Sequence, residues 1–107
     1  MKKTLSILTL SILIAAPSAF AGGGGSDGPA VYKAKCAMCH GPDGAGQTTM
    51  GKNLKVRALG SAEVQKQTDA ELTKWISDGK GKMPAYKAKL TPVDIQAVVE
   101  FIRTLKK

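Results

Sequence analysis

Both cysteines and the single histidine of the chain lie together in the segment Cys36-Ala37-Met38-Cys39-His40. This Cys-x-x-Cys-His spacing is the attachment motif of c-type haem. On one helical turn, thiols three residues apart can reach the two vinyl groups of a haem, while the adjacent imidazole lies beneath the iron. The motif therefore predicts one covalently bound haem c, held by Cys36, Cys39 and the iron ligand His40.

Other uses of these three side chains fit less well. A dithiol redox pair of the thioredoxin kind accompanies alternating strands and helices, which this sequence does not predict. A structural zinc ion needs four ligands, whereas the chain offers two cysteines and one histidine. A haem ligated by two histidines is excluded, because no second histidine exists.

The second axial ligand of the iron must then be another residue, and a methionine thioether suits this role. Met83 is the predicted ligand, because the glycines of Gly79-Lys80-Gly81 permit tight turns and Pro84 restricts the chain just after the sulfur. Met38 lies inside the attachment turn, and Met50 is expected to fill the core. Ligation by Met50 and an open sixth position remain as alternatives.

The elements that must position these residues are predicted to be helices. One is expected over 28–39, with proline at its first turn, and one from a capping box at Thr68 to about Ser77. A last helix starts at Thr91, and its apolar residues repeat at helical spacing. The glycine-rich region 41–67 is predicted to be mostly loop, with a helical turn around 61–67.

The first 21 residues are predicted to be a secretory signal peptide cleaved after Ala21. Lys2 and Lys3 precede an apolar run over 5–16, and Ala19-Phe20-Ala21 forms an A-x-A cleavage pattern. A retained membrane anchor is the alternative, but the run is shorter than the ~20 residues of a spanning helix. Residues 22–27 then form a flexible Gly/Ser tether, and 28–107 form one monohaem domain.

The chain is basic, with a formal net charge of +8. The predicted leader carries two of the 16 basic residues and none of the 8 acidic ones, so about +6 remains after cleavage. Six lysines lie beside the attachment motif or around Met83, namely Lys33, Lys35, Lys80, Lys82, Lys87 and Lys89. They predict redox partner proteins with acidic docking surfaces, although a generically soluble basic surface is the alternative. Export argues against nucleic acid as a partner.

The chain resembles the class I c-type cytochromes, most closely the small bacterial members and the photosynthetic members that replace plastocyanin. Besides the attachment motif, the resemblance rests on Gly28, Tyr32 and Cys36 at spacings of four, on Gly51-Lys52-Asn53-Leu54, on the segment 76–86, and on Val98-x-x-Phe101. It implies an all-α cytochrome c fold, with three to four short helices around one covalently bound haem.

The resemblance also implies particular contacts. Gly28 is expected to pack near Phe101 where the first and last helices cross. The family usually has proline at the position of Lys52, where the backbone carbonyl accepts a hydrogen bond from Nδ1 of the haem histidine, here His40. Trp75 has two interpretations, a hydrogen bond to a haem propionate or simple cover of the haem edge, and Tyr86 is expected to pack structurally. The aliphatic residues expected near the ring are Leu54, Leu72, Ile76, Leu90 and Ile95.

The predicted function is that of a periplasmic one-electron carrier, not an enzyme, that is monomeric and has no membrane anchor after cleavage. A haem-based gas sensor, or a haem subunit of a larger oxidoreductase with a labile sixth ligand, is the alternative. Peroxidase-like chemistry is disfavoured, because no second histidine is available as an acid–base group.

Overall fold

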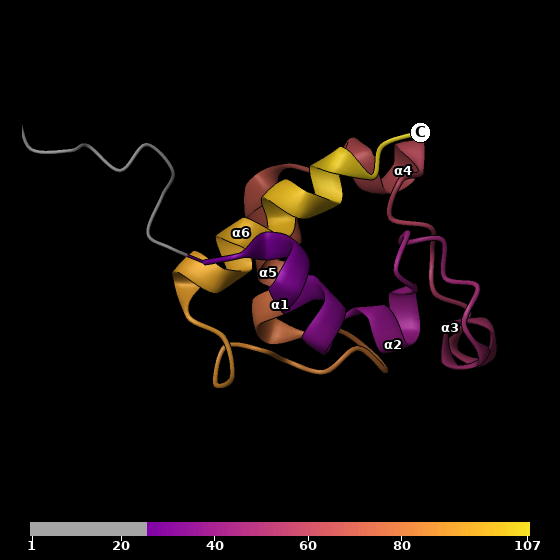
Figure 1. The fold of residues 1–107 in the computed structure, drawn as a ribbon, viewed down its shortest axis with the longest axis horizontal. Coiled ribbons are helices and arrows are strands. Elements are labelled where there is room, and N and C mark those ends of the chain that lie inside the picture. The colour runs from indigo at the N-terminus through magenta and orange to yellow at the C-terminus, as the bar shows by residue number, and fades with distance from the viewer. Residues whose placement is uncertain (1–25) are drawn as a thin grey trace, which may run out of the picture.

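A computed structural model of the chain describes residues 26–107, and this part is built of helices (Figure 1). Six helices are described: α1 (Gly28–Lys35), α2 (Ala37–His40), α3 (Thr49–Leu54), α4 (Ala62–Gln65), α5 (Asp69–Asp78) and α6 (Pro92–Thr104). Within 26–107, no helix is long and apolar enough to cross a bilayer. The all-α prediction is confirmed, whereas the predicted leader, 1–21, and tether residues 22–25 lie outside the described part.

The number of helices differs from the three to four that were expected. The helix predicted over 28–39 is broken at Cys36, which ends α1 and precedes α2 with φ of −114° and ψ of −34°. The region 41–67 contains α3 as well as α4, and α4 corresponds to the predicted turn at 61–67. The prediction misses α3 because its six residues include a glycine and show no apolar periodicity.

The first and last helices cross at a glycine, as the family resemblance implies (Figure 1). A Cβ atom at Gly28 would collide with the carbonyl oxygen of Ala97 and would lie 3.5 Å from Cβ of Phe101. The rings of Tyr32 and Phe101 pack beside this point, with centroids 4.8 Å apart. Only glycine therefore lets α1 and α6 approach this closely.

The last two residues of the predicted tether contact the helical domain. Ser26 Oγ donates a hydrogen bond to Asp94 Oδ1 at 2.6 Å. Asp27 caps α1, because its carboxylate accepts from the N–H of Ala30 at 3.2 Å. Ser26 and Asp27, predicted from the sequence to lie in the tether, thus make hydrogen bonds to α6 and α1.

The capping box predicted at Thr68 is formed, and Thr91, predicted to start the last helix, forms a capping box as well. Thr68 Oγ1 accepts from the N–H of Glu71 at 3.1 Å, and the Glu71 carboxylate accepts from the N–H of Thr68 at 3.2 Å. Thr91 and Asp94 make the same two bonds at 3.1 and 2.9 Å. These local bonds satisfy otherwise unpaired N–H groups, so α5 and α6 begin where the sequence predicts.

The core lies where α1, α5 and α6 meet. It is mainly aliphatic and contains Tyr32, Val64, Leu72, Ile76, Leu90, Ile95, Val98, Val99 and Ile102. Met50 was expected among these residues, but its side chain is 44% exposed. The expectation was wrong because α3, which carries Met50, was not foreseen.

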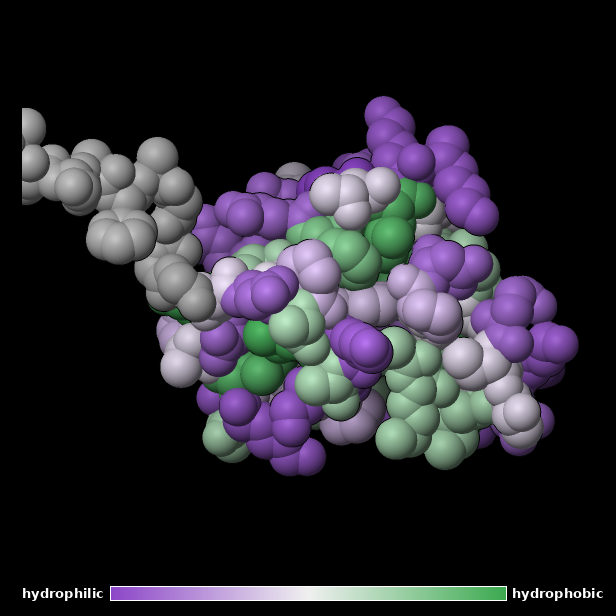
Figure 2. All heavy atoms as spheres, viewed as in Figure 1, coloured by the Kyte–Doolittle hydropathy of each residue, from purple (hydrophilic) through white to green (hydrophobic). Residues whose placement is uncertain are grey.

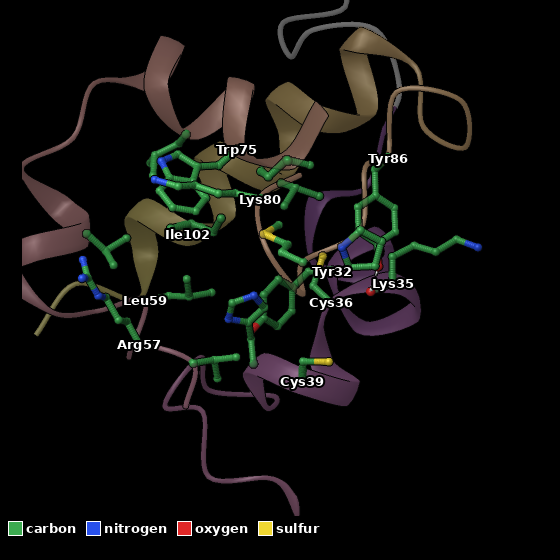
Figure 3. A pocket seen from close by; sticks show the side chains of 18 of the residues that line it. Tyr32, Lys35, Cys36, Cys39, Arg57, Leu59, Trp75, Lys80, Tyr86 and Ile102 are labelled. Atoms are coloured by element: carbon green, nitrogen blue, oxygen red, sulfur yellow. Dashed lines mark hydrogen bonds between the residues drawn. The ribbon is translucent and has the colours of Figure 1, made fainter. Parts of the chain in front are cut away.

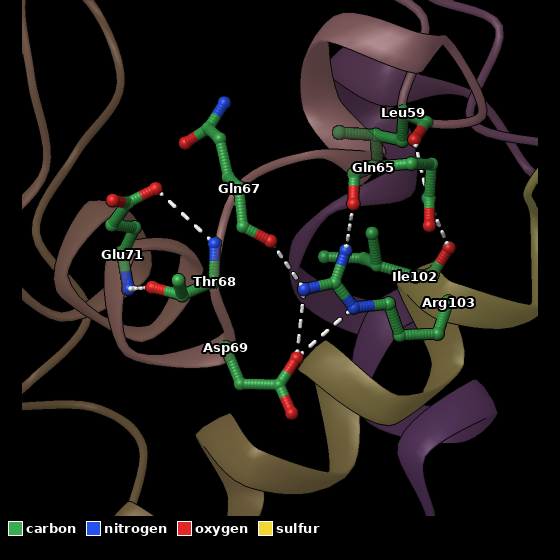
Figure 4. A network of polar contacts seen from close by, with 8 residues as sticks. All are labelled: Leu59, Gln65, Gln67, Thr68, Asp69, Glu71, Ile102 and Arg103. Carbon is green, nitrogen blue, oxygen red and sulfur yellow. Dashed lines mark hydrogen bonds and ion pairs between the residues drawn. The ribbon is translucent and has the colours of Figure 1, made fainter.

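Arg103 fastens the linker between α4 and α5 to α6 (Figure 4). Its guanidinium donates to the carbonyl oxygens of Gln65 and Gln67 at 2.8 and 2.6 Å and pairs with Asp69 at 2.8 Å. The Gln65 side chain in turn donates to the carbonyl oxygen of Ile102 at 3.0 Å. This network fixes one wall of the cavity described below, because Gln67 and Ile102 both line it.

Candidate functional site

A cavity of about 480 Å³ opens between the attachment motif and the segment that carries Met83 (Figure 3). Its volume falls in the range of about 300–1,000 Å³ that is typical of cofactor and small-molecule sites. Cys36, Cys39, His40 and Met83 all line it. The four residues predicted to hold the cofactor are thus brought to one cavity, although Met83 lies far from the motif in sequence.

The break between α1 and α2 positions the two thiols. The carbonyl oxygen of Cys36 accepts from the N–H groups of Cys39 and His40 at 3.3 and 3.0 Å, which closes a helical turn. Tyr32 Oη donates to the Gly41 carbonyl oxygen at 2.6 Å, and this buried bond fastens the end of α2 to α1.

The two cysteines are free and half-buried. Burial, together with the nearby Cys39, raises the pKa of the Cys36 thiol to about 11. Reactive dithiol pairs need the opposite shift, because the attacking species is the thiolate. Burial therefore disfavours the Cys36 thiolate that a thioredoxin-like pair would need.

His40 has a buried nitrogen, Nδ1, with no hydrogen-bond partner among the described residues. Burial also lowers its pKa, which favours the neutral imidazole that ligates metals. The bond expected from Nδ1 to the Lys52 carbonyl is absent. Lys52 lies inside α3, and its carbonyl oxygen accepts from the N–H of Lys55 instead, at 3.3 Å. His40 thus lines the cavity with a neutral imidazole favoured, which fits a metal ligand, whereas the orphaned Nδ1 reflects the missing carbonyl partner.

Met83 is the one methionine of the described residues that lines the cavity. It lies in a tight turn where Lys80 and Met83 exchange two backbone hydrogen bonds, at 3.1 and 3.0 Å. Gly79 enters this turn with φ of +69°, and a Cβ there would lie 2.5 Å from the Met83 carbonyl oxygen. Met38 and Met50 are 73% and 44% exposed and lie outside the lining.

The aliphatic lining was predicted in part. Leu54, Leu72 and Ile76 line the cavity, but Leu90 and Ile95 lie in the core without reaching it. The residues missed by the prediction are Val56, Leu59, Val64, Val98 and Ile102, with the polar side chains of Arg57 and Gln67. The helical spacing of Val98 and Ile102 was recognised in the last helix, but this spacing does not tell which apolar residues of the helix reach the cavity.

Besides Tyr32, the aromatic residues Trp75 and Tyr86 line the same cavity. Trp75 is 37% exposed, and the Lys80 ammonium lies 4.6 Å from its ring centroid. Tyr86 donates its hydroxyl to the carbonyl oxygen of Lys35 at 3.0 Å, which links the Met83 segment to the end of α1. These contacts do not decide between a propionate hydrogen bond and simple cover of the haem edge for Trp75. The hydroxyl bond of Tyr86 to Lys35 agrees with the structural role expected for Tyr86.

The surface around the site is basic, with exposed apolar groups between the charges. The six lysines near the motif and Met83 are all exposed, and Lys35, Lys80 and Lys82 reach the cavity lining. Figure 2 shows a weakly hydrophobic patch over α2, where Met38 is exposed. Such a mixed surface suits brief, charge-guided contacts between proteins.

Comparisons with known proteins agree with this geometry. Over residues 24–102 the chain matches the family described as cytochrome C oxidase, cbb3-type, subunit III. It is 37% identical to cytochrome c6 of Leptolyngbya boryana, with 70% of this chain and 85% of that protein covered. It is 32% identical to cytochrome c6 of Gloeothece citriformis, with 95% and 93% covered. The solved structure of the KustC0563 c-type cytochrome is similar, with a TM-score of 0.71, 37% identity, and 76% of this chain and 99% of that one covered.

Proposed function

The chain belongs to the small class I c-type cytochromes, and from this premise we propose that it is a periplasmic one-electron carrier that shuttles electrons between redox proteins. The observation that carries the proposal is the convergence of the attachment motif and Met83 on one largely apolar cavity. Relatives named cytochrome c6, of which the chain covers 85% and 93%, support a carrier of this size.

Each of the four site residues has a definite role. Cys36 and Cys39 would hold haem c through two thioether bonds, while His40 and Met83 would ligate the iron. The bound haem supplies an iron that accepts and returns one electron with no bond made or broken in a substrate. His40 contributes a neutral imidazole, because burial lowers its pKa.

The apolar wall and the lysines complete the carrier. Side chains such as Leu72, Ile76 and Val98 exclude water from the cavity, and this low-dielectric surround raises the potential and limits reorganisation when charge changes. The exposed lysines around the opening would attract acidic surfaces of donor and acceptor proteins and accelerate encounter at low ionic strength. A monomer fits such transient exchange.

The visible and near-infrared spectrum of the purified, oxidised holoprotein tests the ligation. The weak methionine-to-ferric-iron charge-transfer band is expected in the wild type. It should be lost in Met83→Ala and retained in Met50→Ala, a matched change at a methionine outside the cavity. A high-spin wild-type spectrum without the band would refute ligation by Met83 and favour a haem-based sensor.

A second candidate is a haem subunit of a larger oxidoreductase, which the description of the matched family favours. The two candidates differ in the cell fraction in which the protein is found. Osmotic shock should release a carrier as a monomer of the cleaved chain, whereas a subunit would stay with the membrane fraction until detergent is added. The same fractions, sequenced from the N-terminus, test cleavage after Ala21.

A further inference from the structure

The segment that carries Met83 is joined to α5 by a side-chain contact as well as by backbone. Its turn begins directly after α5, where the N–H of Gly79 donates to the Trp75 carbonyl oxygen at 2.9 Å. The next residue, Lys80, folds back over the same tryptophan, and its Nζ lies 4.6 Å from the ring centroid (Figure 3). Trp75 thus accepts from Gly79 through its carbonyl oxygen and contacts Lys80 through its ring, on either side of the left-handed residue Gly79, whose φ is +69°.

Lys80 also determines where Met83 lies. The two residues form the ends of a tight turn and exchange both of their backbone hydrogen bonds, at 3.1 and 3.0 Å. An ideal Cβ at Gly81, inside the turn, has no described atom within 4 Å, and the nearest backbone anchor after the turn is the N–H of Tyr86, which donates to the Ile76 carbonyl oxygen at 3.0 Å. A side chain that holds Lys80 on α5 therefore holds Met83 over the cavity as well.

The ring of Trp75 is the partner that the structure provides for the Lys80 ammonium. The two ion pairs within 26–107 are Arg57 with Glu63 and Arg103 with Asp69, and neither involves Lys80. A cation within about 6 Å of a tryptophan face is attracted by the ring quadrupole, and tryptophan is the strongest such partner. Because Trp75 is 37% exposed, the attraction belongs to the weaker, solvated class.

We propose that Lys80 is a positioning residue that latches the Met83 turn onto Trp75 and so opposes displacement of Met83 from the iron by an external ligand. The proposal rests on the proposed function, because it takes Met83 as the ligand. An external ligand can bind only when the turn has moved away, so its apparent affinity is the intrinsic affinity multiplied by the open fraction. Weakening the latch raises that fraction.

The test is a titration of the oxidised holoprotein with imidazole, a neutral nitrogen donor, followed by loss of the charge-transfer band. Lys80→Met keeps the aliphatic chain and removes the cation. Lys82→Met removes an equal charge from the same turn, and Lys82 itself has no cation–π partner among residues 26–107. The ratio of the two affinities therefore isolates the contact with Trp75 from the general effect of charge on the iron.

Lys80→Met is expected to bind imidazole about two- to fivefold more tightly than Lys82→Met, which is the size of one solvated cation–π contact. Lys80→Arg should restore the wild-type affinity, because arginine keeps the cation over the ring. In a Trp75→Leu background the difference between Lys80→Met and Lys82→Met should vanish.

Equal affinities in the two methionine variants, or a difference that survives in Trp75→Leu, would overturn the latch while leaving Met83 as the ligand. Absence of the charge-transfer band from the wild type is a different signature. It would overturn the ligation itself, and the latch with it.

Discussion

Gly28→Ala is expected to destabilise the holoprotein, although alanine is ordinarily the better residue in a helix. Alanine gains up to about 1 kcal/mol over glycine in a helix interior, and less at the first turn, where Gly28 lies. Against this gain, the new Cβ would overlap the carbonyl oxygen of Ala97 and touch its carbonyl carbon at 3.0 Å. Both atoms belong to the backbone of α6, so no side-chain rotation relieves the overlap.

The cost of the overlap exceeds the gain in propensity. Forcing one extra carbon into a packed contact costs about 1–3 kcal/mol, and a rigid backbone neighbour favours the upper end. Moving α1 away from α6 would also loosen the contact between the tilted rings of Tyr32 and Phe101. The net loss is about 2 kcal/mol, which corresponds to a fall in Tm of about 8–16 °C for a domain of this size.

Urea unfolding of the purified holoprotein, followed by circular dichroism, measures the loss directly. Ala34→Gly is the matched control, because Ala34 is exposed on the same helix and its replacement changes helix propensity alone, by about 1 kcal/mol. If propensity decided both sites, Gly28→Ala would gain stability as Ala34→Gly loses it. A Gly28→Ala protein as stable as the wild type would refute the close crossing of α1 and α6.

Two further changes test local features of the fold. Lys55 ends α3 with φ of 55° and ψ of 44°, a left-handed conformation that costs a side-chain residue about 1–2 kcal/mol, so Lys55→Gly should raise the free energy of unfolding by about 0.5–1 kcal/mol. Lys52→Gly, inside the same helix, should lower the free energy of unfolding. If both variants lowered it, the left-handed conformation of Lys55 would be contradicted. The Ser26 hydroxyl first, and then Thr91, hold the pKa of Asp94 below its ordinary value by hydrogen bonding to the carboxylate. A carboxylate whose pKa is lower in the folded protein stabilises the fold at pH values above its pKa in the unfolded chain, which is about 4. This stabilisation is lost as the pH falls through the pKa of the carboxylate in the folded protein. The difference in free energy of unfolding between the wild type and Asp94→Asn should therefore shrink as the pH is lowered from about 6 to about 2.5. An equal difference at the two pH values would count against this role of the Asp94 carboxylate.

Features encoded within a few residues were predicted well. The capping box at Thr68 and the helix start at Thr91 were placed correctly, because each side chain and the N–H that it caps lie three residues apart. The small residue at Gly28 was also placed correctly against Phe101, though by family resemblance and not by a local signal.

Several features that depend on distant contacts were not predicted. α3 has few apolar residues, and it is held by Thr48, whose hydroxyl accepts from the N–H of Gly51 at 2.8 Å and donates to the Cys39 carbonyl oxygen at 2.9 Å. The exposure of Met50 follows from that helix. Leu90 and Ile95 have the right hydrophobicity for the cavity wall, but hydrophobicity does not say which side of a core residue meets the cavity.

The sequence by itself determined the chemistry that this chain can offer. Two thiols and an imidazole at the Cys-x-x-Cys-His spacing lie on one helical turn whatever the remainder of the chain does, so their joint use was readable from five residues. The tertiary structure decided how that chemistry is enclosed. It brought Met83 to the cavity that His40 lines, left Nδ1 of His40 without the expected partner, and folded Lys80 over Trp75. These contacts join segments that are separate in the chain, and only packing of the helices brings them together.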